Sequence, residues 1–312
     1  MRFGVTGATG FIGASLREAL TAAGAETCVL ARNPDRFRES LAARSNDTCE
    51  IIPGDLDDAN ALAKLCHGVD AVLHLAGVTH PRVEADYHRV NVEGAVNAAR
   101  AAADAGARFV HVSSISAREP HLSPYAQSKA SSETAIAGVG GDWRALRLPA
   151  IYGPRDKATL PYFKLIAKGF ALDPRTSVPA RASLLFAGDA AAAIIAGAKA
   201  PSGVIYEIGD DQPDGREWAE IGVVLAEVLG RSARPLRVPF GLVQAAYGFI
   251  QPVEGFLGRE PSVRSGQARE FFHADWVARH NLLSDAVAWS AQTKLHDGFA
   301  QTTHWYRENG LL

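Results

Sequence analysis

The stretch Thr6-Gly7-Ala8-Thr9-Gly10-Phe11-Ile12-Gly13 decides the fold of this 312-residue chain. It follows a short apolar run, residues 2–6, that is typical of a buried strand, and it opens an amphipathic run, residues 11–22, that predicts a helix. Glycines permit a tight turn there, and the free N–H groups at a helix start attract a pyrophosphate. We therefore expect a dinucleotide to bind at Gly7, Thr9, Gly10, Phe11, Ile12 and Gly13, with a purely structural turn as the alternative.

Outward from this turn, short apolar runs alternate with longer amphipathic runs about six times. Near-continuous apolar strands of this kind predict an α/β fold, with a Rossmann-type doubly wound parallel sheet. Prolines interrupt the pattern after Gly153. We therefore expect a dinucleotide-binding domain over residues 1–153 and a small, discontinuous substrate lobe over residues 154–312, with elements at about 182–210 returning to the first domain.

Composition limits the class of protein. The chain is 47% hydrophobic and 21% charged with a net charge of −2, which is typical of a soluble globular protein. This nearly neutral balance argues against nucleic acid or an anionic membrane as the main partner, because both favour a basic excess. Cys28, Cys49 and Cys66 have neither metal-ligand nor disulfide spacing, so we expect no metal and a reducing compartment, the cytoplasm. The longest uncharged stretch, residues 238–253, is too short for an integral membrane segment; we expect a buried or interface-covering helix, with peripheral membrane contact as the alternative.

The residue after the second predicted strand, Arg32, bears on the choice of coenzyme. An acidic residue at this place binds the ribose hydroxyls of NAD, whereas a guanidinium can bind the 2′-phosphate of NADP. We therefore expect NADP, with NAD as the alternative, unless Arg32 is only a solvated loop charge. Asp55, Leu56, Ala76 and Gly77 follow later strands and are expected at the coenzyme, with ordinary turns as the alternative.

A serine, a tyrosine and a lysine form the candidate catalytic group. Tyr125 and Lys129 are four residues apart in a predicted helix and so share one face. A cation about 4 Å from a phenolate stabilises it by at most about 4 kcal/mol at an effective dielectric near 20, which favours Tyr125 as a general acid–base. Ser114 ends the preceding strand and would hold a substrate oxygen beside Tyr125, while nicotinamide carries the hydride. The Tyr-x-x-x-Lys spacing alone also occurs by chance in structural helices.

Together these motifs resemble the extended short-chain dehydrogenase/reductase superfamily, in particular its NAD(P)-dependent epimerase/dehydratase group. The similar segments are Thr6–Gly13, His74–Gly77, Asn91–Gly94, Val112–Ser114, Ser123–Lys129, Arg147–Pro154, the region of Asp189, and Trp305-Tyr306. The resemblance implies Ser114, Tyr125 and Lys129 as the catalytic set, with Lys129 also on the nicotinamide ribose. It also implies that Pro149 and Ile151 lie on the nicotinamide side and that a homodimer forms through the helix of residues 84–105 and the helix of Tyr125.

Two departures from that family bear on the substrate. Ala150 stands where relatives that act on nucleotide sugars carry an asparagine, and Ala117-Arg118-Glu119 replaces a Tyr-Gly pair. We therefore expect an oxidoreductase that acts on a small ketone or alcohol. The alternatives are a nucleotide-sugar epimerase or dehydratase and a non-catalytic cofactor-binding scaffold. Candidate substrate contacts are Thr79, His80, Tyr152 and Arg181, of which Arg181 could equally form a surface ion pair.

Overall fold

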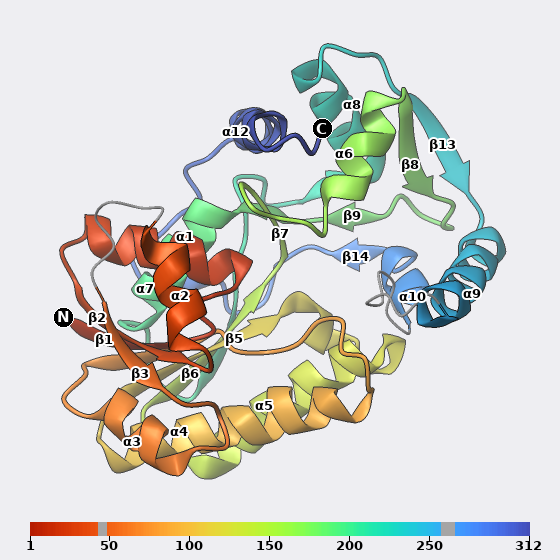
Figure 1. Ribbon diagram of the computed structural model, residues 1–312. Helices are drawn as coiled ribbons and strands as arrows, with labels where there is room; N and C mark the ends of the chain where they lie inside the picture. The colour runs from red at the N-terminus through yellow and green to blue at the C-terminus, as the bar shows by residue number, and fades with distance from the viewer. Residues whose placement is uncertain (43–48, 257–265) are drawn as a thin grey trace.

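A seven-stranded parallel sheet forms the centre of the computed structural model, which describes residues 1–42, 49–256 and 266–312 (Figure 1). The strand order is β11-β6-β5-β4-β1-β2-β3. From β1 the chain first adds β2 and β3 on one side and then crosses over to add β4, β5, β6 and β11 on the other side, so the order switches between β1 and β4. This is the expected Rossmann-type α/β fold. The strands are β1 (Arg2–Thr6), β2 (Glu26–Ala31), β3 (Glu50–Pro53), β4 (Ala71–His74), β5 (Arg108–Ser114), β6 (Trp143–Leu148) and β11 (Val204–Glu207).

Helices cover both faces of this sheet (Figure 1). One face carries α1 (Phe11–Ala22), α2 (Pro34–Ala42) and α7 (Ala187–Gly197), and the other carries α3 (Ala59–Cys66), α4 (Gly94–Asp104) and α5 (Pro124–Val139). Each face has its own apolar core. Val5, Leu16 and Ile194 belong to the first core, whereas Leu62 and Phe109 belong to the second. Because both faces are covered, the strands can be apolar along their whole length.

The helix expected over residues 84–105 is interrupted. A π-helical segment, Tyr87–Glu93, precedes α4. Four of the six alanines of α4 are buried with the second core; they are Ala95, Ala98, Ala99 and Ala102. The small side chains of this alanine-rich face therefore allow the helix to pack closely against the sheet.

The chain returns to the main sheet late in the sequence. β10 (Leu184–Phe186) pairs with β7 (Ala150–Tyr152) in a separate two-stranded sheet. α7 then packs into the core of the first face, and β11 adds to the edge of the main sheet beside β6. These elements lie where the sequence predicted a return, and the division of the chain into two domains stays a prediction.

A second cluster of elements covers the carboxyl side of the sheet (Figure 1). Helices α6 (Leu160–Ala167), α8 (Trp218–Val228) and α12 (Leu295–Glu308) share a third apolar core around Phe163, Leu225 and Phe299. β8 (Phe170–Pro174) pairs with β13 (Arg234–Val238), and β9 (Arg181–Ala182) lies between β12 (Arg216–Glu217) and β14 (Asp275–Trp276). Short helices α10 (Gln267–Phe271) and α11 (Leu283–Ala286) precede α12.

The uncharged stretch after residue 238 forms α9 (Phe240–Phe256) at the surface of this second cluster. Leu242 and Phe249 are exposed, so the prediction that this stretch is buried is wrong for the single chain. In the part of the chain that the structure describes, no helix combines the length and the apolar character needed to cross a membrane.

Candidate active site

Strand register brings the predicted site residues to one edge of the sheet. Thr6 of β1 pairs with His74 of β4, which pairs with His111 of β5, and Ser114 of β5 pairs with Leu148 of β6. The residues that follow these strands therefore lie at the carboxyl edge, where open α/β sheets bind their ligands. This edge holds the glycine turn, Ala76-Gly77, Ser114 and Pro149.

The glycine turn has no room for larger residues. Gly7 has a φ of +73°, and a Cβ added to it would lie 2.5 Å from the Ala76 nitrogen. A Cβ added to Gly13 would lie 2.3 Å from the Gly7 oxygen. Thr9 and Gly10 are exposed at the start of α1, while Phe11 and Ile12 are half-buried. A tight turn with accessible backbone at a helix start fits the pyrophosphate of a dinucleotide.

Arg17 supports this turn and is a site residue that the sequence analysis missed. It is buried, and its Nε donates a hydrogen bond to the Ala8 oxygen at 3.1 Å. Its guanidinium also lies 4.9 Å from the centre of the Phe37 ring. A signal was present, because Arg17 shares the predicted buried face of the helix with Gly13 and Leu20.

The residues expected at the adenosine end lie between β2 and α3. Arg32 directly follows β2 and is exposed, whereas Arg38 forms an ion pair with Asp35 at 2.7 Å. Asp55 Oδ1 accepts a hydrogen bond from the backbone of its own turn, and Leu56 is half-buried against α4. Of the basic residues near β2, Arg32 is thus well placed for an added phosphate.

Ser114 lies at the end of β5 and caps the short 3-10 turn Ile115–Arg118. Its Oγ accepts hydrogen bonds from the backbone nitrogen of Ser116 at 3.2 Å and from the Ser116 hydroxyl at 2.9 Å. Because Ser114 acts as acceptor in both bonds, its own O–H is left to donate to a substrate oxygen.

Tyr125 and Lys129 lie on the first two turns of α5. Ser123 caps this helix by accepting a hydrogen bond from the Ala126 nitrogen, and Tyr125 is half-buried. Lys129 is buried, and its Nζ donates to the Val112 oxygen at 2.9 Å. The ammonium is also 3.7 Å from the position of a Cβ on Gly77. Lys129 therefore lies between the ends of β4 and β5, where the resemblance places the nicotinamide ribose.

Burial lowers the pKa of Lys129 to about 8, and the Glu133 carboxylate opposes this shift. Glu133 lies one turn further along α5 and is itself buried. It accepts hydrogen bonds from Ser113 Oγ at 2.6 Å and from two guanidinium nitrogens of Arg147 at 2.9 and 2.7 Å. The sequence analysis missed Glu133, which lies next to the candidate catalytic lysine in the buried part of α5.

Asn91 joins the pieces of the site. Its Oδ1 accepts from the Val78 nitrogen at 2.7 Å, and its Nδ2 donates to the Val78 oxygen at 3.0 Å and to Ser128 Oγ at 2.9 Å. The π-helical segment is thereby tied both to the loop after β4 and to α5. This loop contains Gly77, so Asn91 sets the distance between Gly77 and Lys129.

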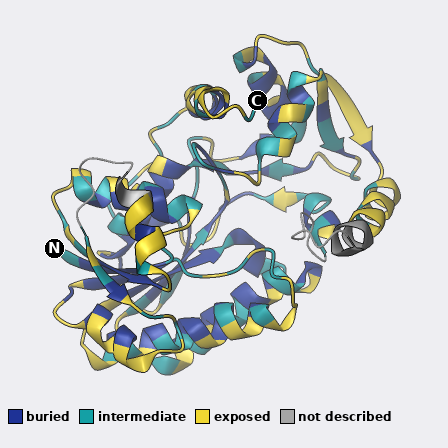
Figure 2. Cartoon of the chain, viewed as in Figure 1, coloured by how far each residue is buried: buried dark blue, intermediate teal, exposed yellow. Residues whose placement is uncertain are grey.

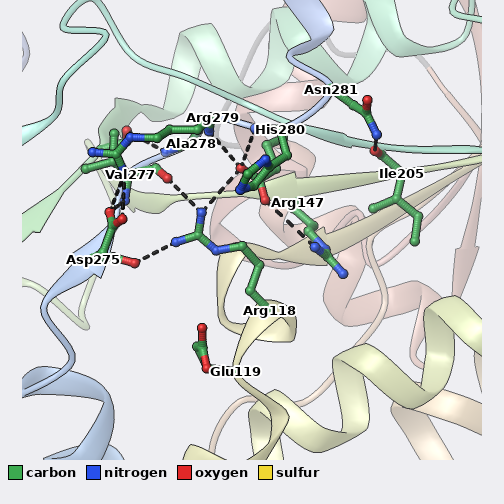
Figure 3. A network of polar contacts seen from close by, with 12 residues as sticks. Arg118, Glu119, Arg147, Ile205, Asp275, Val277, Ala278, Arg279, His280 and Asn281 are labelled. Carbon is green, nitrogen blue, oxygen red and sulfur yellow. Dashed lines mark hydrogen bonds and ion pairs between the residues drawn. The ribbon is translucent and has the colours of Figure 1, made fainter.

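Arg118 fixes the turn after Ser114 to the distant end of the chain (Figure 3). Its guanidinium donates to the oxygens of Val277 at 2.8 Å and Asp275 at 2.6 Å, and it lies 3.4 Å from Glu207 Oε2. Arg118 belongs to the segment Ala117-Arg118-Glu119, which the sequence analysis noted as a departure from the resembling family. No local pattern predicts these contacts, because the partners come from β11 and the segment around β14.

The predicted substrate residues Thr79 and His80 lie in the loop after β4. Thr79 is exposed and its oxygen accepts from the Tyr87 hydroxyl at 2.8 Å, and His80 Nδ1 is 3.1 Å from Thr79 Oγ1. The Tyr87 ring lies 6.2 Å from the Tyr125 ring. This loop is therefore placed beside the candidate catalytic tyrosine.

The other two predicted substrate residues lie farther into the second cluster. Tyr152 is only 2% exposed, and its ring is 4.9 Å from Phe299 in the third core, so it contributes to packing and its contact with substrate stays a prediction. Arg181 is half-buried on β9, and its Nε has no hydrogen-bond partner among the described residues. Pro149 is buried and Ile151 half-buried, directly after β6.

A doubly wound sheet with a glycine-lined helix start and a Ser-Tyr-Lys group at its carboxyl edge defines a dinucleotide-dependent enzyme. The model of the NAD dependent epimerase/dehydratase family matches residues 4–209. The chain belongs to this family and is an NAD(P)-dependent enzyme of the short-chain dehydrogenase/reductase type.

Three known proteins illustrate the similarity. The chain is 38% identical over 310 residues to a ceramide reductase of Caulobacter vibrioides, covering 99% of this chain and 95% of that protein. It is 28% identical to a 4-hydroxy-2-methyl-3-oxo-4-farnesyl-3,4-dihydroquinoline-1-oxide ketoreductase of Stigmatella aurantiaca, covering 79% and 78%. Among solved structures, UDP-glucuronic acid 4-epimerase from Bacillus cereus, in complex with UDP-glucuronic acid and NAD, has a TM-score of 0.72 at 19% identity, covering 99% of this chain and all of that one.

Proposed function

We propose that this protein is a reductase that uses NADPH to convert a ketone on a ceramide-like lipid into an alcohol. The observation that carries this proposal is the similarity to ceramide reductase along nearly the whole chain. Ala150 supports this proposal. The resemblance implies that enzymes acting on sugar nucleotides carry an asparagine at this exposed position, where it helps to hold the diphosphate of the substrate. The similarity to a ketoreductase of a farnesyl-bearing compound also favours an apolar substrate.

The residues of the site divide the chemistry among them. Bound NADPH supplies the hydride that forms the new C–H bond at the carbonyl carbon. Tyr125 donates its phenolic proton to the carbonyl oxygen, while Ser114 donates a hydrogen bond that holds this oxygen in place. The Lys129 ammonium would contact the ribose of bound nicotinamide coenzyme and would stabilise the phenolate that Tyr125 becomes. Solvent then returns a proton to Tyr125, so the balance is one ketone, one hydride and one proton for one alcohol.

The direct test combines purified protein, NADPH and the ketone analogue of ceramide in mixed micelles. Reduced coenzyme should disappear in step with alcohol formation. Tyr125→Phe is the matched variant, because it keeps the ring and removes the proton; it should bind NADPH like the wild type and lose at least about a hundredfold in rate. Unchanged turnover by Tyr125→Phe would contradict the role of Tyr125. Unchanged cellular function of this variant, with intact coenzyme binding, would support the scaffold alternative instead.

The preference for NADP is the finer part of this proposal. Arg32 supports it, because its exposed guanidinium directly follows β2 and could bind a 2′-phosphate in a bidentate manner. Arg32→Gln should weaken NADPH binding about tenfold or more, since a charge-assisted hydrogen bond contributes about 1.5–3 kcal/mol, and should leave NADH binding nearly unchanged. Tighter binding of NADH than of NADPH by the wild type would contradict the preference.

One observation favours a second candidate, an epimerase or dehydratase of a sugar nucleotide. The buried Nε of Arg181 has no hydrogen-bond partner among the described residues, and a diphosphate would provide one. In that reaction the coenzyme is regenerated in every cycle. Sugar-nucleotide conversion without net consumption of NADPH would select this candidate over the reductase.

We also propose a homodimer that forms through the outer faces of α4 and α5. A surface hollow between these helices supports it and is lined by Val96, Arg100, Ala135 and Val139 among others. Sedimentation equilibrium should give twice the chain mass, and Val96→Asp should reduce it to that of one chain. A wild-type protein of single-chain mass would contradict the dimer.

A further inference from the structure

Helix α9 is mostly exposed where its side chains are described (Figure 2). Leu242, Ala245, Ala246 and Phe249 are spaced by three or four residues, share one face of the helix and are all exposed. The side chains of Leu242 and Phe249 are 62% and 77% exposed. Helices of a globular protein turn such a stripe toward the core. Among the described residues this stripe stays exposed, which makes it a candidate contact surface.

The chain next to this stripe is basic. Arg231, Arg234 and Arg237 are the only charged residues between Glu227 and Glu254, although the whole chain has a net charge of −2. All three are exposed, on or just before β13, and β13 leads directly into α9. Arg237 is 3.3 Å from Asp173 but keeps 79% of its side chain exposed. Exposed cations thus precede the exposed apolar helix along the chain, and we call the apolar stripe of α9 together with these three arginines the α9 face.

The α9 face is linked to the candidate active site through α10. Phe240 of α9 packs on Phe272 with ring centres 5.4 Å apart. Within α10, Arg269 Nε donates to the Leu122 oxygen at 2.7 Å, and Glu270 accepts a hydrogen bond from Ser123. Ser123 is the cap of the helix that carries Tyr125. Helix α9 is therefore connected through α10 to the segment that caps the helix of Tyr125.

We propose that the α9 face docks on an anionic lipid membrane, with Leu242 and Phe249 inserted among the acyl chains and the three arginines at the headgroups. Interfacial helices combine such an apolar face with cations that face acidic lipids. Charge argues against a second copy of this chain as the occupant, because a symmetric pair would bring the same arginines together. The exposed apolar side chains and the arginines favour this docking whether or not the proposed reaction is correct. If the protein does reduce a ceramide-like lipid, docking would bring the enzyme to its substrate.

The test is cosedimentation of the full chain with vesicles of phosphatidylcholine, with and without phosphatidylglycerol. The wild type should bind the anionic vesicles more tightly, and added salt should weaken this binding. Leu242→Asp with Phe249→Asp should reduce the affinity about a hundredfold or more, because two large apolar side chains no longer enter the lipid. Arg234→Gln and Arg237→Gln should each reduce it about fivefold on anionic vesicles.

Val223→Asp is the matched control, because Val223 is an exposed apolar residue on α8, in the same cluster of elements but outside the α9 face. It should bind vesicles like the wild type. Equal binding by the Leu242/Phe249 variant, or no binding by the wild type, would overturn the proposal. So would a loss of dimer mass in that variant without loss of vesicle binding, because the occupant would then be a second copy. Reduction of a short, water-soluble ketone should be unchanged in this variant, which separates docking from the proposed chemistry.

Discussion

Gly13→Ala is the substitution that the glycine turn should tolerate least. Gly13 is the third residue of α1, and an added Cβ would meet the Gly7 oxygen at 2.3 Å and the Ala8 Cα at 2.8 Å. Both contacts are backbone atoms, which cannot swing away as the end of a long side chain can. Ordinary van der Waals contact for a Cβ begins near 3.4 Å. The turn and the helix start must therefore separate by roughly 1 Å.

This displacement should have two measurable consequences. Overpacking of a tight site costs about 1–3 kcal/mol of stability. The helix amides that would contact the pyrophosphate move by the same distance, so coenzyme affinity should fall about tenfold or more. Chemical denaturation would report the first effect, and titration calorimetry with NADPH would report the second.

Gly138→Ala is the matched control for this substitution. Gly138 lies in the last turn of α5 and lines the hollow of the proposed dimer; in the single chain an added Cβ has no described atom within 4 Å, and sedimentation would check that the variant keeps the wild-type mass. Alanine is favoured over glycine in a helix by about 0.5–1 kcal/mol, so this variant should be as stable as the wild type or slightly more stable, with unchanged NADPH binding. Gly13→Ala protein with wild-type coenzyme affinity would refute the assignment of the turn as the pyrophosphate site.

Three further outcomes are expected. The proposed reaction needs the Lys129 ammonium, whose pKa is about 8 in the free enzyme, so kcat/KM for coenzyme should fall as the pH rises through about 8. Glu133→Gln removes the carboxylate that raises the pKa of Lys129, so in this variant the fall should occur at lower pH. An unchanged pH profile would contradict the coupling between Glu133 and Lys129. Burial raises the pKa of Cys66 to about 12, so a thiol reagent at neutral pH should modify half-buried Cys49 in the native protein and spare Cys66, as peptide mapping would reveal. Asn91→Ala leaves the loop after β4 without its partners and should lower the free energy of unfolding by about 1–3 kcal/mol, whereas a loss below about 0.5 kcal/mol would argue against its joining role.

The main sheet was predictable because its signals are local. The bounds of β1 and α1 are those that the sequence predicts, since an apolar run, a glycine turn and an amphipathic run follow one another directly. The second cluster was harder to predict. Its sheets pair segments far apart in the chain, such as β8 with β13, and short strands of two to five residues carry little periodicity. The burial of α9 was predicted wrongly for another reason. An uncharged sequence does not show whether a helix is buried in its own chain or exposed to an outside partner.

The candidate site divides in the same way. Ser114, Tyr125 and Lys129 stand in recognisable motifs, and strand register brings their elements to one edge of the sheet. Glu133 and Arg118 act through partners on other strands, which no spacing along the chain reveals. Residues that position a catalytic group through long-range contacts are therefore the part of a site that single-sequence reasoning overlooks.

The most direct test of the central claim is a single-turnover experiment with NADPH deuterated at the transferred position and the ketone analogue of ceramide. The account predicts one deuterium on the carbinol carbon for each coenzyme oxidised, and loss of this transfer in Tyr125→Phe with coenzyme binding retained. Product without deuterium, or transfer by Tyr125→Phe at the wild-type rate, would contradict it.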